Sequence, residues 1–122
     1  MAGTDTPSLA GRRILLVEDE YFIAEDMVRV FKECAAEIVG PASNVEDALE
    51  LLDATDALDG AVLDVNLQGE MAYPIADALK ARGVPFVFAT GYDASSIAPP
   101  YRDVVRCEKP VSPKTIAQAL FG

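Results

Sequence analysis

The chain has 122 residues, of which 51% are hydrophobic and 25% are charged, a composition typical of one globular domain and not of a disordered segment. Twenty acidic residues against ten basic ones give a formal net charge of −10, which argues against a nucleic-acid partner because phosphate contacts need clustered lysine and arginine. The chain has no histidine, which excludes histidine-based acid–base catalysis, histidine metal ligation and phosphohistidine chemistry on its own side chains.

Membrane and redox features are also missing from the sequence. No apolar run approaches the roughly 18 residues of a membrane span, and the first residues carry no signal-peptide pattern. We therefore expect a cytoplasmic protein with no membrane partner. The two cysteines, Cys34 and Cys107, are far apart and lie in apolar surroundings, so we expect both to be buried free thiols.

Short apolar runs bounded by turn residues predict five strands. They cover residues 14–17, 37–40, 60–66, 85–89 and 104–107. The central run, Gly-Ala-Val-Leu-Asp-Val-Asn, is apolar up to Asp64, as expected of a parallel strand that is buried on both faces.

Helical periodicity follows these runs. Residues 20–34 and 71–82 each carry one apolar face, and Gly83 ends the second of these helices. Another helix is expected to start at the capping box Ser43-Asn44-Val45-Glu46, and the last at the N-cap and first-turn proline of Ser112-Pro113. The residues expected to face the core are Ile23, Met27, Val30, Phe31, Val45, Ala48, Leu49, Leu52, Ala72, Ile75, Ala76, Leu79, Ile116, Ala117, Leu120 and Phe121.

The order of the elements is a strand followed by a helix, repeated five times. This order implies right-handed crossovers and predicts an α/β fold, a doubly wound (βα)5 five-stranded parallel sheet of the flavodoxin type. The fourth helix is expected to be short or irregular, because Pro99-Pro100 interrupts residues 92–102. Residues 1–11 are expected to form a flexible tail, and residues 12–122 one domain.

Polar residues at the ends of the strands form the candidate site. Because the ends of parallel strands meet at one edge, Glu18, Asp19 and Asp64 should converge there, with Thr90 and Lys109 beside them. Two carboxylates about 4 Å apart repel by roughly 4 kcal/mol at an effective dielectric constant of about 20, so the cluster needs a counter-charge. Mg²⁺ suits a site with few carboxylates and several waters, and Lys109 supplies a second, fixed positive charge.

These groups suit phosphoryl transfer to a carboxylate. Asp64 is a plausible nucleophile, because aspartate can form an acyl phosphate. Mg²⁺ would screen the repulsion between Asp64 and an incoming phosphoryl group, and Lys109 and Thr90 would hold the phosphoryl oxygens.

Four motifs in this order resemble those of the receiver domain of two-component response regulators. They are Leu16-Val17-Glu18-Asp19-Glu20, Leu63-Asp64-Val65-Asn66, Thr90 and Lys109-Pro110. Each motif alone is weak, whereas four of them in order, each at the end of a strand, are highly specific. The resemblance covers residues 12–121 and makes the chain similar to a single-domain response regulator.

The resemblance implies a role for each residue of the site. Asp64 would be the phosphoacceptor, and Thr90 and Lys109 would contact the phosphoryl group. Glu18, Asp19 and Asp64 would hold Mg²⁺ together with the backbone carbonyl of Asn66. The family also implies a cis peptide between Lys109 and Pro110. The phosphoryl donor would be a phosphohistidine on a sensor histidine kinase or on a phosphotransfer protein.

Two positions depart from the common receiver pattern. Many receivers carry Tyr or Phe three residues before the lysine as a rotamer switch, whereas this chain has Arg106. Thr90 is followed by Gly91-Tyr92, where a small residue such as Ala is common. Phe88-Ala89-Thr90-Gly91-Tyr92 resembles the FATGUY subgroup of receivers, which is often linked to HWE-type histidine kinases. We therefore hypothesise that Tyr92 and the 92–102 segment carry the signal.

Each candidate residue also has a simpler structural role. Asp64 could cap the following helix, and Glu18 and Asp19 could form a solvated helix start favoured by the helix dipole, which is the expected role of Glu20. Lys109 could be a surface lysine, and Thr90 a turn residue. Tyr92 could be only a half-buried aromatic residue. The finding of all these residues at strand ends favours the functional interpretation.

The sequence thus predicts phosphorelay signalling by a receiver that is not a conventional enzyme, catalysing only its own phosphorylation and dephosphorylation. Because the chain ends just after the fifth helix, its expected output is binding to a downstream protein or passing the phosphoryl group on. The alternatives are a receiver cut from a longer regulator or hybrid kinase, and a phosphorylation-independent interaction module. An FMN binder is disfavoured because Glu18-Asp19-Glu20 replaces the phosphate loop, and an aspartate-based phosphatase because Asn66 replaces its second acid.

Overall fold

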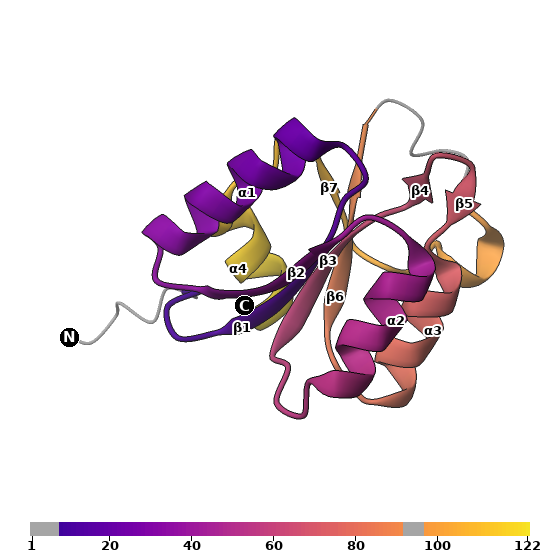
Figure 1. Cartoon of the computed structure of the whole chain (residues 1–122), viewed down its shortest axis with the longest axis horizontal. Helices are drawn as coiled ribbons and strands as arrows, with labels where there is room; N and C mark the ends of the chain where they lie inside the picture. The colour runs from indigo at the N-terminus through magenta and orange to yellow at the C-terminus, as the bar shows by residue number, and fades with distance from the viewer. Residues whose placement is uncertain (1–7, 92–96) are drawn as a thin grey trace.

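A five-stranded parallel sheet forms the centre of the molecule in the computed structural model, which describes residues 8–91 and 97–122 (Figure 1). Its strand order is β2-β1-β3-β6-β7, and every neighbouring pair is parallel. The strands are β1 (Arg13–Val17), β2 (Glu37–Ala42), β3 (Gly60–Asp64), β6 (Phe86–Thr90) and β7 (Arg106–Glu108). The predicted parallel sheet is confirmed.

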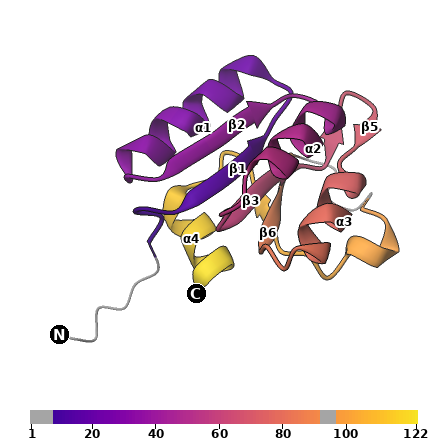
Figure 2. The same ribbon diagram turned by 60° about the horizontal axis from the view of Figure 1, so that its bottom comes forward.

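Helices cover both faces of this sheet. Helices α1 (Tyr21–Glu33) and α4 (Pro113–Phe121) lie on one face, and α2 (Val45–Ala54) and α3 (Tyr73–Ala81) lie on the other (Figures 1 and 2). The chain therefore has the doubly wound α/β architecture that the alternation of strands and helices predicts. In the described part of the chain, no helix is both long and apolar enough to cross a membrane.

The alternating side chains of the central strands divide the core into two layers. Leu15, Leu63 and Phe88 pack toward α2 and α3, whereas Leu16 and Val62 pack toward α1 and α4. Most of the residues expected to face the core are buried. The exceptions are only partly buried, and these are Ile23, Val30, Leu49, Leu120 and Phe121.

Local signals set most of the helix ends. Ser112 caps α4, and its hydroxyl oxygen accepts from the Thr115 amide at 3.1 Å. The cap of α2 is Asn44, one residue later than the predicted Ser43, because the Asn44 side chain accepts from the Asp47 amide at 2.8 Å.

A small hairpin follows β3 where the sequence predicts only the approach to a helix. Strands β4 (Asn66–Leu67) and β5 (Glu70–Met71) pair antiparallel, and α3 begins at Tyr73 and not at residue 71. Gln68 and Gly69 form the turn with φ of 57° and 94°, the conformation that two-residue hairpins favour. The hairpin keeps the chain after Asp64 extended for longer than predicted.

The connection from β6 to β7 contains little regular structure within residues 97–105. A single 3-10 turn, η2 (Pro99–Tyr101), stands where a fourth helix was expected to be short or irregular. The Tyr101 ring stacks on the Tyr73 ring of α3, with centroids 4.2 Å apart, and the Ala98 amide donates to the Tyr73 hydroxyl. Strand β7 starts at Arg106, two residues later than predicted.

Two further expectations need correction. Leu9, within the predicted 1–11 tail, is buried at 2% exposure, and the Gly11 amide donates to the Ala35 carbonyl. Packing therefore includes at least part of residues 8–11, whereas residues 1–7 lie outside the described residues. Cys34 is exposed because it caps the C-terminus of α1 beyond its last buried turn, whereas Cys107 is a buried free thiol as predicted.

Candidate functional site

The strand order of the sheet brings the predicted site residues to one edge. Glu18 follows β1, Asp64 is the last residue of β3, and Thr90 is the last residue of β6. Lys109 follows β7. Because β1, β3, β6 and β7 are consecutive parallel neighbours, their carboxyl ends lie side by side, as predicted.

Three carboxylates meet at this edge. One oxygen atom each of Glu18, Asp19 and Asp64 lies within 4.8 Å of the others. Glu18 is buried at 3% exposure, and the other two are partly buried. The predicted acidic cluster is therefore present, and sequence positions 18 and 64 meet because β1 and β3 pair in register from Ile14 to Val17.

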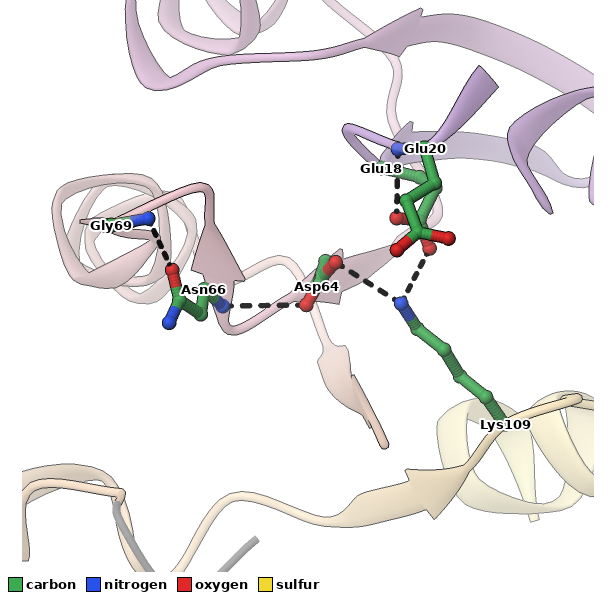
Figure 3. A network of polar contacts seen from close by, with 6 residues as sticks. All are labelled: Glu18, Glu20, Asp64, Asn66, Gly69 and Lys109. Atoms are coloured by element: carbon green, nitrogen blue, oxygen red, sulfur yellow. Dashed lines mark hydrogen bonds and ion pairs between the residues drawn. The ribbon is translucent and has the colours of Figure 1, made fainter. Parts of the chain in front are cut away.

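Lys109 bridges two of these carboxylates, as Figure 3 shows. Its Nζ lies 2.6 Å from Glu18 Oε1 and 3.0 Å from Asp64 Oδ2. The Lys109 backbone amide donates to the Thr90 carbonyl at 2.9 Å, which fixes the start of the lysine side chain against the end of β6. The peptide between Lys109 and Pro110 is cis, as the family resemblance implies.

Burial and charge shift the pKa values of this pair. Burial raises the pKa of Glu18 to about 7, an effect that the hydrogen bond to Lys109 opposes and the neighbouring Asp64 reinforces. For Lys109, burial disfavours the ammonium, yet the hydrogen bonds to Glu18 and Asp64 outweigh it and raise the pKa. The lysine is thus a permanent cation at the edge of the sheet.

The arrangement fits a divalent cation with oxygen ligands. Three carboxylates and one ammonium leave two negative charges when all four groups are ionised. Lys109 Nζ contacts both Glu18 Oε1 and Asp64 Oδ2, so one ammonium faces two carboxylates and a second cation would balance the cluster. Carboxylate oxygens gathered in this way are suitable ligands for Mg²⁺.

The loop after Asp64 is held by its own polar contacts (Figure 3). The Asn66 amide donates to Asp64 Oδ1 at 3.3 Å, and Asn66 Oδ1 accepts from the Gly69 amide at 2.6 Å. On the other side of the cluster, the Glu20 amide donates to Glu18 Oε2 at 3.2 Å. The sequence did not predict the contacts from the Asn66 amide to Asp64 and from the Glu20 amide to Glu18. The only local signal of the hairpin was the Gln68-Gly69 pair.

Thr90 and Tyr92 are the remaining predicted residues. Thr90 is buried at the end of β6, close in the sheet to Asp64, which pairs with Ala89. Tyr92, the predicted switch residue, lies outside the described residues.

An apolar groove adjoins the acidic cluster on the α1 side of the sheet. It has a volume of about 530 Å³, and its lining runs from Phe22, Ile23 and Met27 of α1 to Lys109 and Pro110. Phe22 is 81% exposed and its neighbour Tyr21 71%, unusual values for large aromatic side chains.

Comparisons with known proteins point in one direction. No family model matches the chain. The solution structure of SdrG from Sphingomonas melonis Fr1 is 39% identical, with a TM-score of 0.77 over 89% of this chain and 92% of that chain. The crystal structure of a response regulator receiver protein from Sinorhizobium medicae WSM419 is 25% identical, with a TM-score of 0.72 over 93% of this chain and 94% of that one.

A curated relative extends the comparison to a longer protein. The transcriptional regulatory protein PdtaR from Mycobacterium tuberculosis is 26% identical over 118 residues, which cover 96% of this chain. The chain spans 57% of the length of that relative.

Proposed function

The chain belongs to the receiver domains of response regulators, and we propose on this premise that it accepts a phosphoryl group on Asp64 in a Mg²⁺-dependent reaction. The observation that carries the proposal is the Lys109 bridge. One ammonium, just after β7, reaches both Glu18 at the end of β1 and Asp64 at the end of β3, and these three strands belong to one parallel sheet.

The proposed donor is a phosphohistidine of a sensor histidine kinase or of a phosphotransfer protein. A carboxylate oxygen of Asp64 attacks the phosphorus atom, the phosphorus–nitrogen bond breaks, and the histidine leaves with its electron pair. The product is an acyl phosphate on Asp64. Asp64 is only partly buried, and its exposed part leaves room for the donor to approach.

Charge neutralisation is the main task of the surrounding residues in this proposal. As the Asp64 carboxylate reacts, Lys109 gives up its contact with Asp64 Oδ2 and pairs with a phosphoryl oxygen. The Thr90 hydroxyl donates a hydrogen bond to another phosphoryl oxygen. Glu18, Asp19, Asp64 and the Asn66 carbonyl would hold Mg²⁺. When bound, the metal supplies positive charge to the phosphoryl oxygens in the loose transition state.

The apolar groove beside Lys109 is the surface that we assign to the donor protein. A partner that brings a phosphohistidine to Asp64 must cover the rim of the site, and the exposed Phe22 lies on the groove that reaches Lys109. An amphipathic helix with an apolar face fits such a groove. In this proposal, Phe22→Ala slows transfer from a phosphorylated HWE-type kinase but not from a small acyl phosphate. Val105→Ala, which truncates an exposed apolar residue elsewhere, changes neither.

Further parts of the proposal concern the signal itself. The domain is a signalling module with a downstream protein partner, acts in the cytoplasm, and comprises residues 12–122 together with the packed residues around Leu9. Arg106 stands at the position of the common aromatic switch, so Tyr92 and the segment up to 102 would carry the signal. Tyr92→Ala should then weaken phosphorylation-dependent partner binding and reduce the backbone NMR shift changes beyond the immediate surroundings of Asp64. A response like that of the wild type in both measurements would remove Tyr92 from the switch.

Intact-protein mass tests the proposed chemistry. The protein is incubated with acetyl phosphate with and without Mg²⁺, beside Asp64→Asn. The proposal predicts a gain of one phosphoryl mass that requires both Mg²⁺ and Asp64. A gain that persists in Asp64→Asn would contradict it, and no gain even from a phosphorylated kinase would favour a phosphorylation-independent interaction module.

A further inference from the structure

We infer that Glu70 is a positioning residue for the Mg²⁺ site, because its carboxylate ties the β4–β5 hairpin to the first turn of α2. This inference rests on the proposed function and extends it to a residue outside the acidic cluster. Glu70 lies in β5, and its Oε1 accepts from the Val45 amide at 3.1 Å, which joins two segments 25 residues apart.

The hairpin needs such a tie because it is very short. Its strands have two residues each, and a two-stranded hairpin in isolation is marginally stable at best in water. The contact from the Gly69 amide to Asn66 Oδ1 closes the turn internally. It does not fix the position of the hairpin relative to the sheet, so external contacts must do so.

Contacts outside the hairpin hold it in place. Leu67 is buried in the core and Met71 packs against it, while the Ala72 amide donates to the Val65 carbonyl at 2.8 Å and closes the base of the hairpin. The polar contact to another element is that of Glu70 with Val45. Val45 is the first residue of α2, and its amide has no partner within the helix, so an acceptor there satisfies an otherwise open helix end. A carboxylate at this end is also favoured by the helix dipole.

The tie acts on the proposed metal ligand through strand pairing. Leu67 pairs with Glu70, and Asn66 pairs with Met71, so the position of β5 determines where the Asn66 backbone lies. Asn66 in turn donates its amide to Asp64. Loss of the tie would therefore loosen both the Asn66 carbonyl and the orientation of Asp64.

The effect should be smaller than that of a residue in contact with the ligands. Substitution of groups that directly orient metal ligands typically weakens metal binding by about 10- to 100-fold. Glu70 acts one step further away, and we expect about fivefold weaker binding of Mg²⁺ in Glu70→Ala.

Three further variants, compared with Glu70→Ala, separate the contact with Val45 from other roles of Glu70. Glu70→Gln keeps an acceptor of the same reach without the charge, and should stay within about twofold of wild type. Glu70→Asp keeps the charge but is one methylene shorter, and should behave like Glu70→Ala. Asn44→Ala removes the other side-chain cap of α2, that of the Asp47 amide, without touching the hairpin, and should leave Mg²⁺ affinity unchanged.

Two measurements are made on each protein. Titration with Mg²⁺ alone, followed by NMR, gives the dissociation constant. Amide hydrogen exchange without metal then reports on the hairpin through two amides. The Gly69 amide is hydrogen-bonded within the hairpin, and the Ala72 amide is hydrogen-bonded at its base. We expect faster exchange at both amides in Glu70→Ala and Glu70→Asp, and wild-type rates in Glu70→Gln and Asn44→Ala.

The outcomes distinguish this inference from the function on which it rests. Wild-type protein that binds no Mg²⁺ would count against the proposed function, while metal-free exchange would still test the tie. Wild-type affinity and exchange in Glu70→Ala would overturn the inference. Weak Mg²⁺ binding in Glu70→Gln with normal binding in Glu70→Asp would also overturn it, because the charge of the side chain and not its reach would then set the affinity. Equal weakening of Mg²⁺ binding in Asn44→Ala would overturn it as well, because the stability of α2 would then explain the loss.

Discussion

The two helical layers of this receiver meet the site edge in different ways. On the α2–α3 side, side chains reach across to the backbone of neighbouring segments: Glu70 caps α2, Arg82 donates to carbonyls at the other end of α2, and Tyr73 accepts from the Ala98 amide. On the α1–α4 side, Phe22 and Tyr21 stay exposed beside a groove. We infer that one layer mainly stabilises the site and that the other is available for recognition.

Two phenylalanines test this division with the largest expected effect. Phe88 is fully buried in the α2–α3 layer and contacts the rings of Tyr73 and Phe86. Phe88→Ala should lower the free energy of unfolding by about 3–5 kcal/mol, because it leaves a cavity. Phe22→Ala should change it by no more than about 0.5 kcal/mol. Urea denaturation measures both, and similar losses in the two variants would break the comparison.

Two arginines test it again with a smaller effect. Arg82 donates to the carbonyls of Leu52 and Thr55 at the C-terminal end of α2. Arg82→Ala should lower the free energy of unfolding by about 1–2 kcal/mol through loss of these hydrogen bonds. Arg29 on α1 pairs only with exposed acidic residues among its described contacts, and Arg29→Ala should have no measurable effect in the same experiment.

Metal binding sharpens the comparison, because the acidic cluster lies between the two layers. If Mg²⁺ binds with a dissociation constant of about 1 mM, about 10 mM of it should stabilise the fold by roughly 1.4 kcal/mol. Thermal unfolding should then shift upward by a few degrees. Asp19→Asn replaces one carboxylate of the cluster by a neutral amide and should reduce or abolish the shift, whereas an equal shift would place Asp19 outside the site.

The smallest expected effect is a difference in reactivity between the two cysteines, Cys34 and Cys107, on opposite sides of the burial boundary. Burial raises the pKa of the Cys107 thiol, so little thiolate forms, and the side chain is also shielded from reagents. Cys34 is exposed at the end of α1. Iodoacetamide at pH 8 should label Cys34 much faster than Cys107, as peptide mass spectrometry would show; preferential labelling of Cys107 would contradict this view of the core.

The sequence was sufficient to place the site residues at or next to the strand ends, although the predicted ends of β2, β3, β6 and β7 differ from the observed ends by one or two residues. Asp64 and Lys109 could be located from the apolar runs and from the parallel order of strands alone. The hairpin after Asp64 could not be predicted, because strands of two residues are too short to show a periodic pattern. The bond between Glu70 and Val45 joins segments 25 residues apart, and no local signal announces such a contact.

Cys34 and Leu9 show a second limit of local reasoning. Cys34 follows an apolar helix and was expected to be buried, yet it lies just past the last turn that faces the sheet. Leu9 lies in a polar segment that resembles a tail, yet it packs in the α1–α4 layer of the core. In both cases burial depends on where the chain turns relative to the sheet, which short windows of sequence do not determine.

The location of the phosphoryl group tests the central claim most directly, because Glu18 and Asp19 are carboxylates close to Asp64. Treatment of the phosphorylated protein with borohydride reduces an acyl phosphate to an alcohol, and peptide mass spectrometry then locates the reduced residue. The account predicts reduction at position 64 alone, dependent on Mg²⁺. Reduction at position 18 or 19 of the wild-type protein would contradict it.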